Sequence, residues 1–425
     1  AQRQSFLPHL AIDLKGFGQG SVIEGGAKVQ SQVFGSLTGG EVPYYIEVPE
    51  VYISTTRKLS RVQAAIGRKQ HAWNKLDDYW KLGIWQPRFR WDYLEPQTVG
   101  LTGLFLQGSF PWFAISLFAS PLFVPERGAP IVFANGTMSS NGPFFYSPSP
   151  TVRPVGEQDT PVVYQLQAPS VREILLQPSI SAQVKIGKEG HSLGPWGSLA
   201  YAYKPMNQLL LGSFAYLDVQ VPGDGSSGNT VQAALFPRVA YHHLTSLEAG
   251  LESEWTTFWV SFLDERPVVP ANDPSWTVVQ QVATASSVSA SLEWKLGKWF
   301  NDQARVGISY LRRWGGNAPD SGDFKTTSSF FEYRYPFQHA ISVGLRSPML
   351  GDRLGLSSRF IYDLDLGGAS VSADLDFTPR AAWRLALGVD LIGSSISESS
   401  PSFGDDFFSR YRGNNRVRAG VSYVF

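Results

Sequence analysis

Cysteine and histidine, the side chains that most often carry chemistry, offer few candidate sites in this chain. No cysteine occurs among the 425 residues, which excludes thiol catalysis, disulfide scaffolds, zinc fingers and iron–sulfur sites. His242 and His243 are adjacent near the end of an expected strand, so they point to opposite faces and cannot easily share a metal. A Gly-x-Ser-x-Gly spacing occurs at 190–194, but it stands between two expected strands rather than between a strand and a helix. No metal-like spacing of histidines and carboxylates occurs either, so we expect no metal, no cofactor and no enzyme. The histidines are His9, His71, His191, His242, His243 and His339.

Charged side chains recur opposite the apolar face of the expected strands, and they are better candidates for a function. If the strands close into a barrel, these charges line its lumen. One interpretation is a solvated interior in which opposite charges neutralise one another; the other is a selectivity lining that sorts ions and polar solutes. Because both signs occur, strong selectivity for anions or cations is not expected. The lumen-lining candidates are Lys28, Arg305, Arg346, Arg359, Asp363, Asp374, Asp376, Arg384, Asp390, Arg416 and Arg418.

Residues 69–97 mix aromatic and charged side chains more densely than the rest of the chain. Within them, residues 74–81 are compatible with two turns of helix. The segment either folds into the lumen, where charges of both signs set up a constriction, or forms an interfacial loop with Trp and Tyr at headgroup level. The sequence leaves both alternatives open. The candidates for a constriction or interface are Trp73, Asp77, Asp78, Trp80, Lys81, Arg88, Arg90 and Trp91.

Strands must position these side chains, and alternation with a period of two reveals them. Residues 369–377 alternate most clearly, with Ala, Val, Ala, Leu and Phe on one face and Ser and Asp on the other. Residues 417–425 also alternate and finish on an aromatic residue. Such an ending is explained if the last strand closes a barrel by pairing with an early strand, which removes a sticky edge. The signal for this closing strand lies in Val421, Tyr423 and Phe425.

The fold class expected from this pattern is all-β, an antiparallel transmembrane barrel of roughly 16 to 18 strands with long loops. Early strands are expected at 10–14, 27–37, 44–56, 61–68, 99–109 and 111–119. Later strands are expected at 174–186, 196–204, 208–220, 231–241, 245–262, 276–283, 286–296, 304–313, 328–335, 338–347, 353–364, 369–377, 382–392 and 416–425.

Connections between the strands should alternate between long and short in a barrel. Tight turns are expected at 204–207, 336–338, 366–368 and 378–381, and longer connections at 221–230, 264–275, 314–327 and 393–415. Counted back from the C-terminus, the alternation fails at 314–327, which indicates a missed or wrongly divided strand. Residues 120–172, rich in Pro, Gly and Ser, are expected to be a long extracellular loop or a plug.

Composition agrees with one barrel domain over residues 1–425. Charged residues make up 17% of the chain, against about a quarter in an average globular domain. Lys plus Arg and Asp plus Glu number 36 each, so the net charge gives no support to a nucleic-acid partner. Gly and Pro interrupt the charge-free stretch 97–125, so we expect no transmembrane helix there. No signal peptide is visible, and the N-terminus looks like that of a mature chain.

The closing strand, the alternation of Gly and aromatic residues and the lack of cysteine resemble the porin superfamily of Gram-negative outer-membrane barrels across most of residues 26–425. The resemblance implies passive passage of small polar solutes and a homo-oligomer in contact with membrane lipid and lipopolysaccharide. It also implies insertion by the outer-membrane assembly machinery, which reads the last strand. More specifically, the chain resembles the PopA-like porin-like proteins of predatory bacteria, which form rings that enclose lipid.

Other functions stay open beside a solute channel. One alternative is a structural, lipid-organising barrel whose lumen is blocked by 69–97 or 120–172. Another is a channel for hydrophobic substrates, although the charged inner faces of the expected strands disfavour an apolar path. A barrel enzyme would need an activated nucleophile at the rim, and nothing beyond the spacing around Ser192 marks one.

Overall fold

The computed structural model places most of the chain in β-strands. It describes residues 9–34, 44–56, 61–140, 142, 144, 148, 150–152, 159–187, 193–218, 229–268, 277–280, 282–297, 304–317, 334–349, 353–380, 382–398, 400, 404 and 406–423. Among these residues, no helix is long and apolar enough to cross a membrane.

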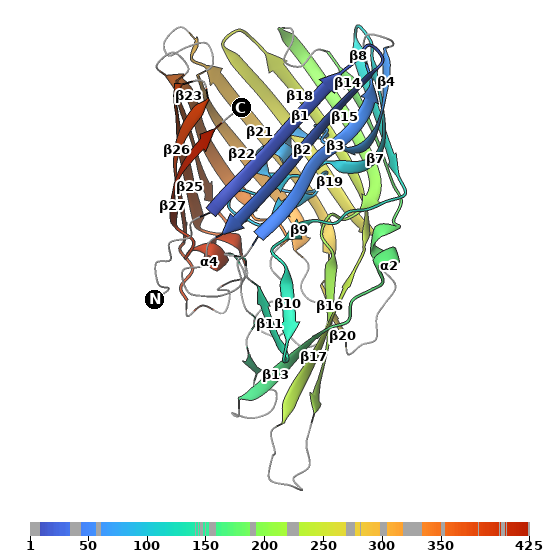
Figure 1. Cartoon of the computed structure of the whole chain (residues 1–425), viewed down its shortest axis with the longest axis vertical. Coiled ribbons are helices and arrows are strands. Elements are labelled where there is room, and N and C mark those ends of the chain that lie inside the picture. The colour runs from blue at the N-terminus through green and yellow to red at the C-terminus, as the bar shows by residue number, and fades with distance from the viewer. Residues whose placement is uncertain are drawn as a thin grey trace.

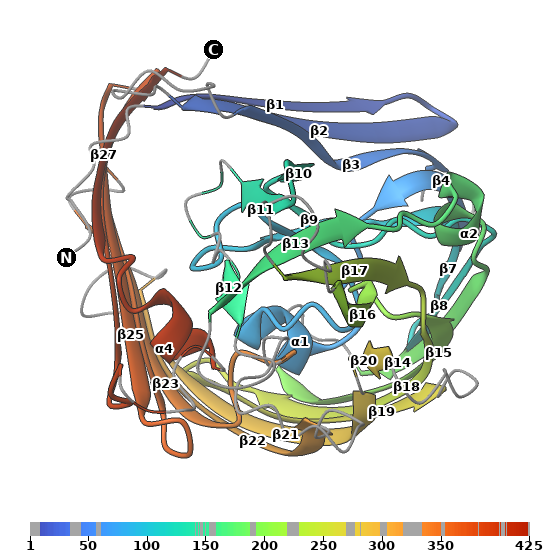
Figure 2. The ribbon, with the colours of Figure 1, turned by 90° about the horizontal axis from the view of Figure 1, so that it is seen from below.

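A single antiparallel sheet of 17 strands curves around a central space (Figures 1 and 2). Each strand pairs with the next strand of the sheet along the chain, which confirms the expected all-β fold class. The strands are β1 (His9–Gln19), β2 (Ile23–Phe34), β3 (Tyr44–Thr55), β4 (Val62–Lys69), β7 (Leu101–Ser109), β8 (Phe113–Ser120), β14 (Ser179–Ile186), β15 (Gly194–Pro205), β18 (Tyr241–Glu252), β19 (Thr256–Val268), β21 (Val282–Lys295), β22 (Arg305–Asn317), β23 (His339–Met349), β24 (Leu354–Asp363), β25 (Gly368–Arg380), β26 (Trp383–Ser394) and β27 (Arg416–Tyr423).

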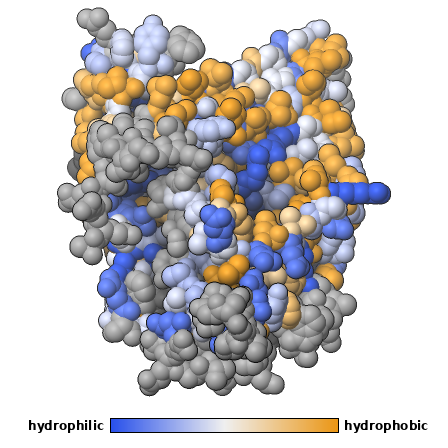
Figure 3. Space-filling model, turned by 60° about the horizontal axis from the view of Figure 1, so that its bottom comes forward, coloured by the Kyte–Doolittle hydropathy of each residue, from blue (hydrophilic) through white to orange (hydrophobic). Residues whose placement is uncertain are grey.

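Alternation along the strands separates an apolar outer face from a polar inner one. On β18, Leu247 is 57% exposed on the outer face, whereas its neighbours Ser246 and Glu248 are buried on the inner face. Glu248 pairs in register with Ser261 of β19, which is also buried. Figure 3 shows hydrophobic side chains gathered over the wall of the sheet in the upper part of the view, and hydrophilic ones more frequent in its lower part. The sheet therefore turns its hydrophobic face outward, as a barrel in a bilayer must.

Connections between the strands alternate strictly between two ends. At the short-connection end they span 20–22, 56–61, 110–112, 187–193, 253–255, 296–304, 350–353 and 381–382. At the long-connection end they span 35–43, 70–100, 121–178, 206–240, 269–281, 318–338, 364–367 and 395–415.

The alternation failed at 314–327 because the sequence count placed a barrel strand and a tight turn between β22 and β23, which pair directly with each other. Residues 334–338 are not in a strand, and 336–338 is no tight turn; both belong to the long connection between β22 and β23. The expected strand 328–335 otherwise lies outside the described residues. Around Pro49, β3 continues through an irregularity in its register with β2. A bulge accommodates proline because the position lacks a ladder hydrogen bond.

Beyond the long-connection end, a second sheet projects from the barrel (Figure 1). The segments 208–220 and 231–241, expected as barrel strands, form its centre instead. The expected tight turn 204–207 is wrong, because 204–205 end β15 and 206–207 begin the long connection that carries this sheet. Residues 120–172, expected as an irregular loop, also contribute strands and a hairpin to this region. The five strands are β12 (Thr151–Val152), β13 (Thr160–Leu166), β16 (Leu210–Asp218), β17 (Thr230–Arg238) and β20 (Thr277–Val279), beside the hairpin of β10 (Ile131–Ala134) and β11 (Thr137–Ser140).

The remaining elements are short. A three-stranded sheet lies inside the curve of the barrel wall, made of β5 (Arg88–Arg90), β6 (Gln97–Thr98) and β9 (Arg127–Gly128). In the described part of the chain, the helices are α1 (Lys75–Trp80), α2 (Val171–Leu175) and α4 (Phe407–Tyr411).

The sequence predicts that the sheet closes by pairing its last strand with an early one. Within the described residues β27 pairs with β26 and β1 pairs with β2, and no ladder joins β27 to β1. Val421 and Tyr423 face outward and are exposed, while Phe425 lies outside the described residues. The role of these residues as a closing signal stays a prediction.

Candidate functional site

The connection between β4 and β7, residues 70–100, lies inside the curve of the sheet rather than at the membrane interface (Figure 2). Trp73, Trp80 and Trp85 are each 1% exposed, and Leu76 is fully buried. We call this connection the inserted segment. It brings the sequence-predicted candidates of 73–91 against the inner wall.

Local hydrogen bonds shape the start of the inserted segment. The Asn74 side chain accepts a hydrogen bond from the Asp77 backbone N–H and caps the N-terminus of α1. After the helix, Lys81 adopts a left-handed conformation with φ of 52° and lets the chain reverse. The Asp77 carboxylate then accepts the backbone N–H groups of Ile84 and Trp85, at 3.0 and 2.8 Å. Asp77 is therefore a structural residue that holds the turn.

A buried carboxylate on the wall anchors this helix. Glu248 of β18 accepts the Lys75 backbone N–H at 2.5 Å and the Asn74 side-chain amide at 3.1 Å. Asn74 also donates to the Ser261 hydroxyl of β19 at 2.8 Å. Because hydrogen bonds to a charged acceptor are the stronger ones, this contact fixes the helix against β18 and β19.

Small residues on the inner wall make room for the aromatic side chains of the inserted segment. The Trp80 indole N–H donates to the Ser289 hydroxyl of β21 at 3.0 Å. Ser289 and its neighbours on the inner face are almost completely buried, so the segment packs directly on them. These serines are Ser261, Ser287, Ser289, Ser291, Ser309 and Ser342.

Aromatic packing continues across the central space. Trp73 stacks on Trp85 with ring centroids 5.4 Å apart, and Trp80 meets Phe337 at 5.6 Å. Phe337 in turn contacts Phe408 of α4 at 5.9 Å. These residues belong to one hydrophobic cluster that reaches from β7 to β26. A hydrophobic core therefore fills part of the barrel interior, which composition did not indicate.

Ion pairs join the inserted segment to the last strand on another side of the interior. Arg416 of β27 pairs with Asp92 at 2.5 Å, and Arg418 pairs with Glu95 at 2.8 Å. Both arginines also pair with Asp390 of β26, at 2.6 and 3.0 Å. The structure thus unites two predicted wall residues with Asp92 and Glu95, which the candidate set lacked although they lie within 69–97.

Other wall charges on this side face solvent. Arg305 and Arg384 are each 52% exposed at the side chain, and Arg384 forms a bidentate pair with Asp376. Arg346 lies opposite Arg305 in the ladder and is exposed. Their register with Asp390 and Arg418 places all of them on the inner face. Water therefore reaches the inner wall along β22–β27 near the short-connection end.

Further predicted wall charges have partners. Arg359 lies over the Tyr79 ring at 4.6 Å, so it holds the inserted segment rather than lining open space. Asp374 pairs with Arg418 at 3.0 Å. Lys28 faces Lys15 and Glu50 in the register of β1–β3. Asp363 is buried and accepts the backbone N–H of Gln338 at 2.7 Å.

The remaining candidates of the inserted segment organise it from within. Arg88 donates to the Asp77 backbone carbonyl at 3.0 Å and lies 3.8 Å from the Asp78 carboxylate. Arg90 pairs with Glu126 at 2.8 Å, which ties the segment to the next long connection. Trp91 packs between aromatic residues of β2 and β3. None of these three contacts is a constriction by itself.

Burial shifts two titratable groups of the segment. Burial lowers the pKa of His71 to about 4, although Gln183 shares a hydrogen bond with its ring. Burial, reinforced by Asp77, raises the pKa of Asp78 to about 7. His71 is therefore neutral at physiological pH, whereas Asp78 titrates close to it.

A buried polar cluster behind the segment was missed by the sequence. Glu265 of β19 forms an ion pair with Arg334 at 2.7 Å and accepts hydrogen bonds from Tyr335 and the His242 ring. The Arg313 guanidinium lies 3.5 Å from the centre of the Tyr335 ring. His242 points inward and His243 outward, so they occupy opposite faces as expected. The only signal in the sequence was a charged residue, Glu265, on the inner face near the end of an expected strand.

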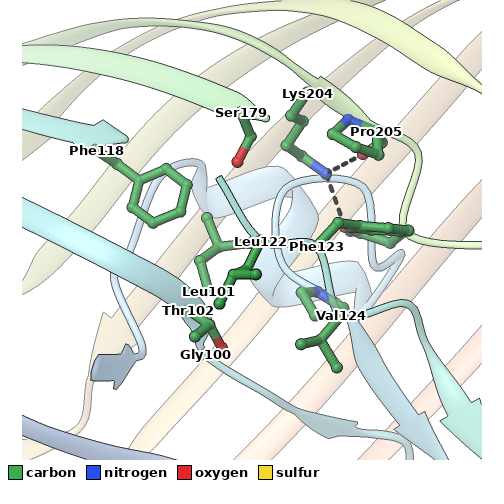
Figure 4. A pocket seen from close by; sticks show the side chains of 12 residues that line it. Gly100, Leu101, Thr102, Phe118, Leu122, Phe123, Val124, Ser179, Lys204 and Pro205 are labelled. Carbon is green, nitrogen blue, oxygen red and sulfur yellow. Dashed lines mark hydrogen bonds between the residues drawn. The ribbon is translucent and has the colours of Figure 1, made fainter. Parts of the chain in front are cut away.

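A small pocket lies between the wall and the inserted segment (Figure 4). Lys204 is buried there, and its ammonium donates to the Pro205 carbonyl at 3.1 Å and to the Asn207 side chain at 2.7 Å. Apolar side chains such as Leu122 and Phe123 form the rest of the lining. The Asn207 side chain in turn donates to the backbone carbonyls of Gly83 and Ile84. The residues around this pocket therefore connect the wall to the inserted segment. Among the described residues, no group of three metal-ligating side chains occurs.

No known protein family and no curated protein sequence matches this chain. Solved structures with a similar course of the chain include OmpF of Salmonella typhi in complex with daunomycin, at 11% identity and a TM-score of 0.41, over 84% of this chain and 83% of that one. OccD3 of Pseudomonas aeruginosa is 10% identical with a TM-score of 0.44, over 100% and 88%. OccAB4 of Acinetobacter baumannii is 9% identical with a TM-score of 0.45, over 92% and 87%. Likeness of this degree assigns no function.

The membrane setting follows from the sheet itself. Large apolar side chains are exposed around the outer wall, while charged and hydroxyl side chains occupy the inner face. A sheet that closes satisfies its backbone groups without water and so can span a bilayer. Closure of this sheet between β1 and β27 stays a prediction. In Gram-negative bacteria such barrels lie in the outer membrane, with their longer loops outside the cell.

Proposed function

We propose that this chain is a porin-like outer-membrane channel in which small polar solutes pass beside the inserted segment. One observation carries the proposal. Charged side chains on the inner wall of β22–β26 remain exposed to water, whereas the inserted segment covers the inner face of β18–β21. Arg305, Arg346 and Arg384 mark this wet side. A lumen filled by protein would bury such charges, whereas the Arg305 and Arg384 side chains stay 52% exposed beside their partners Glu293 and Asp376.

The narrow part of this path is the contact of the inserted segment with β27. Asp92 and Glu95 meet Arg416 and Arg418 there, and both signs of charge face the passing solute. A field between opposed charges favours polar, hydrated solutes and gives little preference for one sign. A hydrophobic substrate would have to pass these ions, which disfavours that alternative.

Conductance tests the proposal. Purified protein inserted into a planar bilayer should give discrete current steps, and Arg346→Glu together with Arg305→Glu should move the reversal potential toward cation preference. Arg266→Gln is a suitable control, because Arg266 is 71% exposed on the outer face of β19 and pairs with Asp264. A folded barrel that inserts and gives no current would refute the channel.

A structural role is the second candidate, and the hydrophobic core across the interior favours it. If the wet side closes at Asp92 and Glu95, the barrel would organise lipid instead of passing solutes. Exposed aromatic residues at the short-connection end, such as Trp112, 82% exposed, and Trp255, would then contact lipid or neighbouring barrels. The PopA-like proposal adds a homo-oligomeric ring around lipid, delivered by the assembly machinery.

Imaging of the protein in mild detergent, with lipid assayed in the same sample, separates the two candidates. A ring of barrels with copurified lipid around its axis supports the organising role. Single barrels or compact trimers without central lipid, combined with current steps, support the channel.

A further inference from the structure

The two end strands of the sheet run in the same direction. Each neighbouring pair in the sheet of 17 strands is antiparallel, and 17 is odd, so β1 and β27 both run from the long-connection end to the short-connection end. A direct ladder between them would be parallel, and parallel pairing is slightly less stable per residue than antiparallel pairing. We call this boundary the seam. Among the described residues no ladder holds it.

A small hairpin of the inserted segment lies behind the seam. Its strands β5 and β6 pair through Arg88 with Thr98 and Phe89 with Gln97. The tip, residues 91–96, contacts the first and the last strands of the sheet near their long-connection ends. We call residues 88–98 the clasp hairpin.

One side of the clasp hairpin is apolar and contacts the N-terminal end of the sheet. The Trp91 ring lies 5.5 Å from Phe34 of β2 and 5.0 Å from Tyr45 of β3. Phe89 meets the same Tyr45 edge-on at 4.7 Å. Trp91, Phe89 and Tyr45 are all buried and form a hydrophobic cluster separate from the main core.

The other side is ionic and contacts the C-terminal end of the sheet. Asp92 pairs with Arg416 at 2.5 Å, and Glu95 pairs with Arg418 at 2.8 Å. Asp92 lies directly after Trp91, so adjacent residues of one tip contact opposite sides of the seam. Figure 2 shows β27 and β1 as the two ends of the curve, with the inserted segment within it.

We propose that the clasp hairpin holds the seam closed from inside, with Trp91 bound to the N-terminal strands and Asp92 and Glu95 bound to β27. The inserted segment and the closure of the barrel are then one structural unit. The ionic side is partly exposed and therefore sensitive to salt, while the aromatic side is not. This role holds whether or not the lumen conducts.

Spin labels across the seam test the clasp. The chain has no cysteine, so Leu14→Cys on β1 and Ala419→Cys on β27 give a unique label pair on the outer face. The distance distribution is measured by electron spin resonance in Arg416→Gln/Arg418→Gln and in Trp91→Ala. Arg384→Gln is the matched control, because its ion pair with Asp376 lies on the same inner face away from the hairpin.

Both clasp variants should broaden the distribution, and the control should leave it unchanged. An unchanged distribution in either clasp variant would overturn the two-sided clasp, and so would equal broadening in the control. If a variant does not fold, salt provides the same test on the labelled chain with no further substitution. Raising the salt concentration to about 1 M shortens the screening length to about 3 Å and should broaden the distribution by releasing the ionic side. No response to salt would contradict that side of the clasp.

Discussion

Replacement of Glu248 by alanine should release the inserted segment without unfolding the sheet. Glu248 is 3% exposed on β18, and its carboxylate receives the Lys75 backbone N–H, the Asn74 side chain and the Ser261 hydroxyl. Glu252→Ala is the control. Glu252 lies on the same strand and face but pairs with Lys295 at 2.9 Å in a partly exposed setting.

The magnitudes differ because of burial. Hydrogen bonds to a charged group contribute about 1.5 to 3 kcal/mol each and are not additive, so Glu248→Ala should weaken docking of the segment by about 3 kcal/mol. That corresponds to a change of roughly 100-fold in the docking equilibrium. A partly exposed ion pair contributes about 0.2 to 1 kcal/mol, so Glu252→Ala should change it by less than about 5-fold.

Hydrogen exchange measures the docking equilibrium of the inserted segment at the backbone amides of Asp77 and Asp78, which donate hydrogen bonds to Asn74. Exchange there should be roughly 100-fold faster in Glu248→Ala, and the amides of β18 and β19 should keep their protection. Single-channel currents should grow in the same variant. A folded Glu248→Ala protein with wild-type exchange at these amides would refute the anchoring role.

Four further predictions concern pH, packing and assembly. The lowered pKa of His71 means that the unfolded chain binds more protons between pH 4 and 6.5, so the unfolding temperature should rise with pH there, and His71→Gln should flatten that rise. The raised pKa of Asp78 acts oppositely: stability falls as pH rises from about 4 to 7, and Asp78→Asn should unfold at a higher temperature than the wild type at pH 8. Ser289→Leu should overpack the wall against Trp80 and lower the free energy of unfolding by about 2 kcal/mol, measured by denaturant titration. Removal of Phe425 should reduce the fraction of protein in the outer membrane on cell fractionation, and unimpaired insertion would contradict the closing-strand prediction.

Alternation predicted the strands wherever one face meets lipid and the other meets polar groups. Residues 369–377 lie in β25, and the strands expected at 99–109 and 111–119 correspond to β7 and β8. The same pattern misled at 208–220 and 231–241, which alternate equally well but belong to the sheet outside the barrel. Alternation records that a strand has two different faces, and it does not record whether lipid or water lies against the outer one.

The candidate site divides in the same way. Sequence placed Arg416 and Arg418 opposite the apolar face of the last strand, and it identified 69–97 as a distinct segment. It left the location of that segment open, because amphipathic aromatic residues suit both a lumen and an interface. It also gave no reason to pair Arg416 with Asp92, which lies more than 300 residues away along the chain.

By itself, then, the sequence determined which side chains share a face of each strand, because the backbone of a strand forces neighbours to opposite sides. From this came the antiparallel sheet, its apolar exterior and its charged interior. Tertiary structure alone decided which of those charges meet water and which meet the inserted segment. That outcome depends on how a long connection folds back across the sheet, and contacts between residues far apart in the chain leave no local periodicity to read.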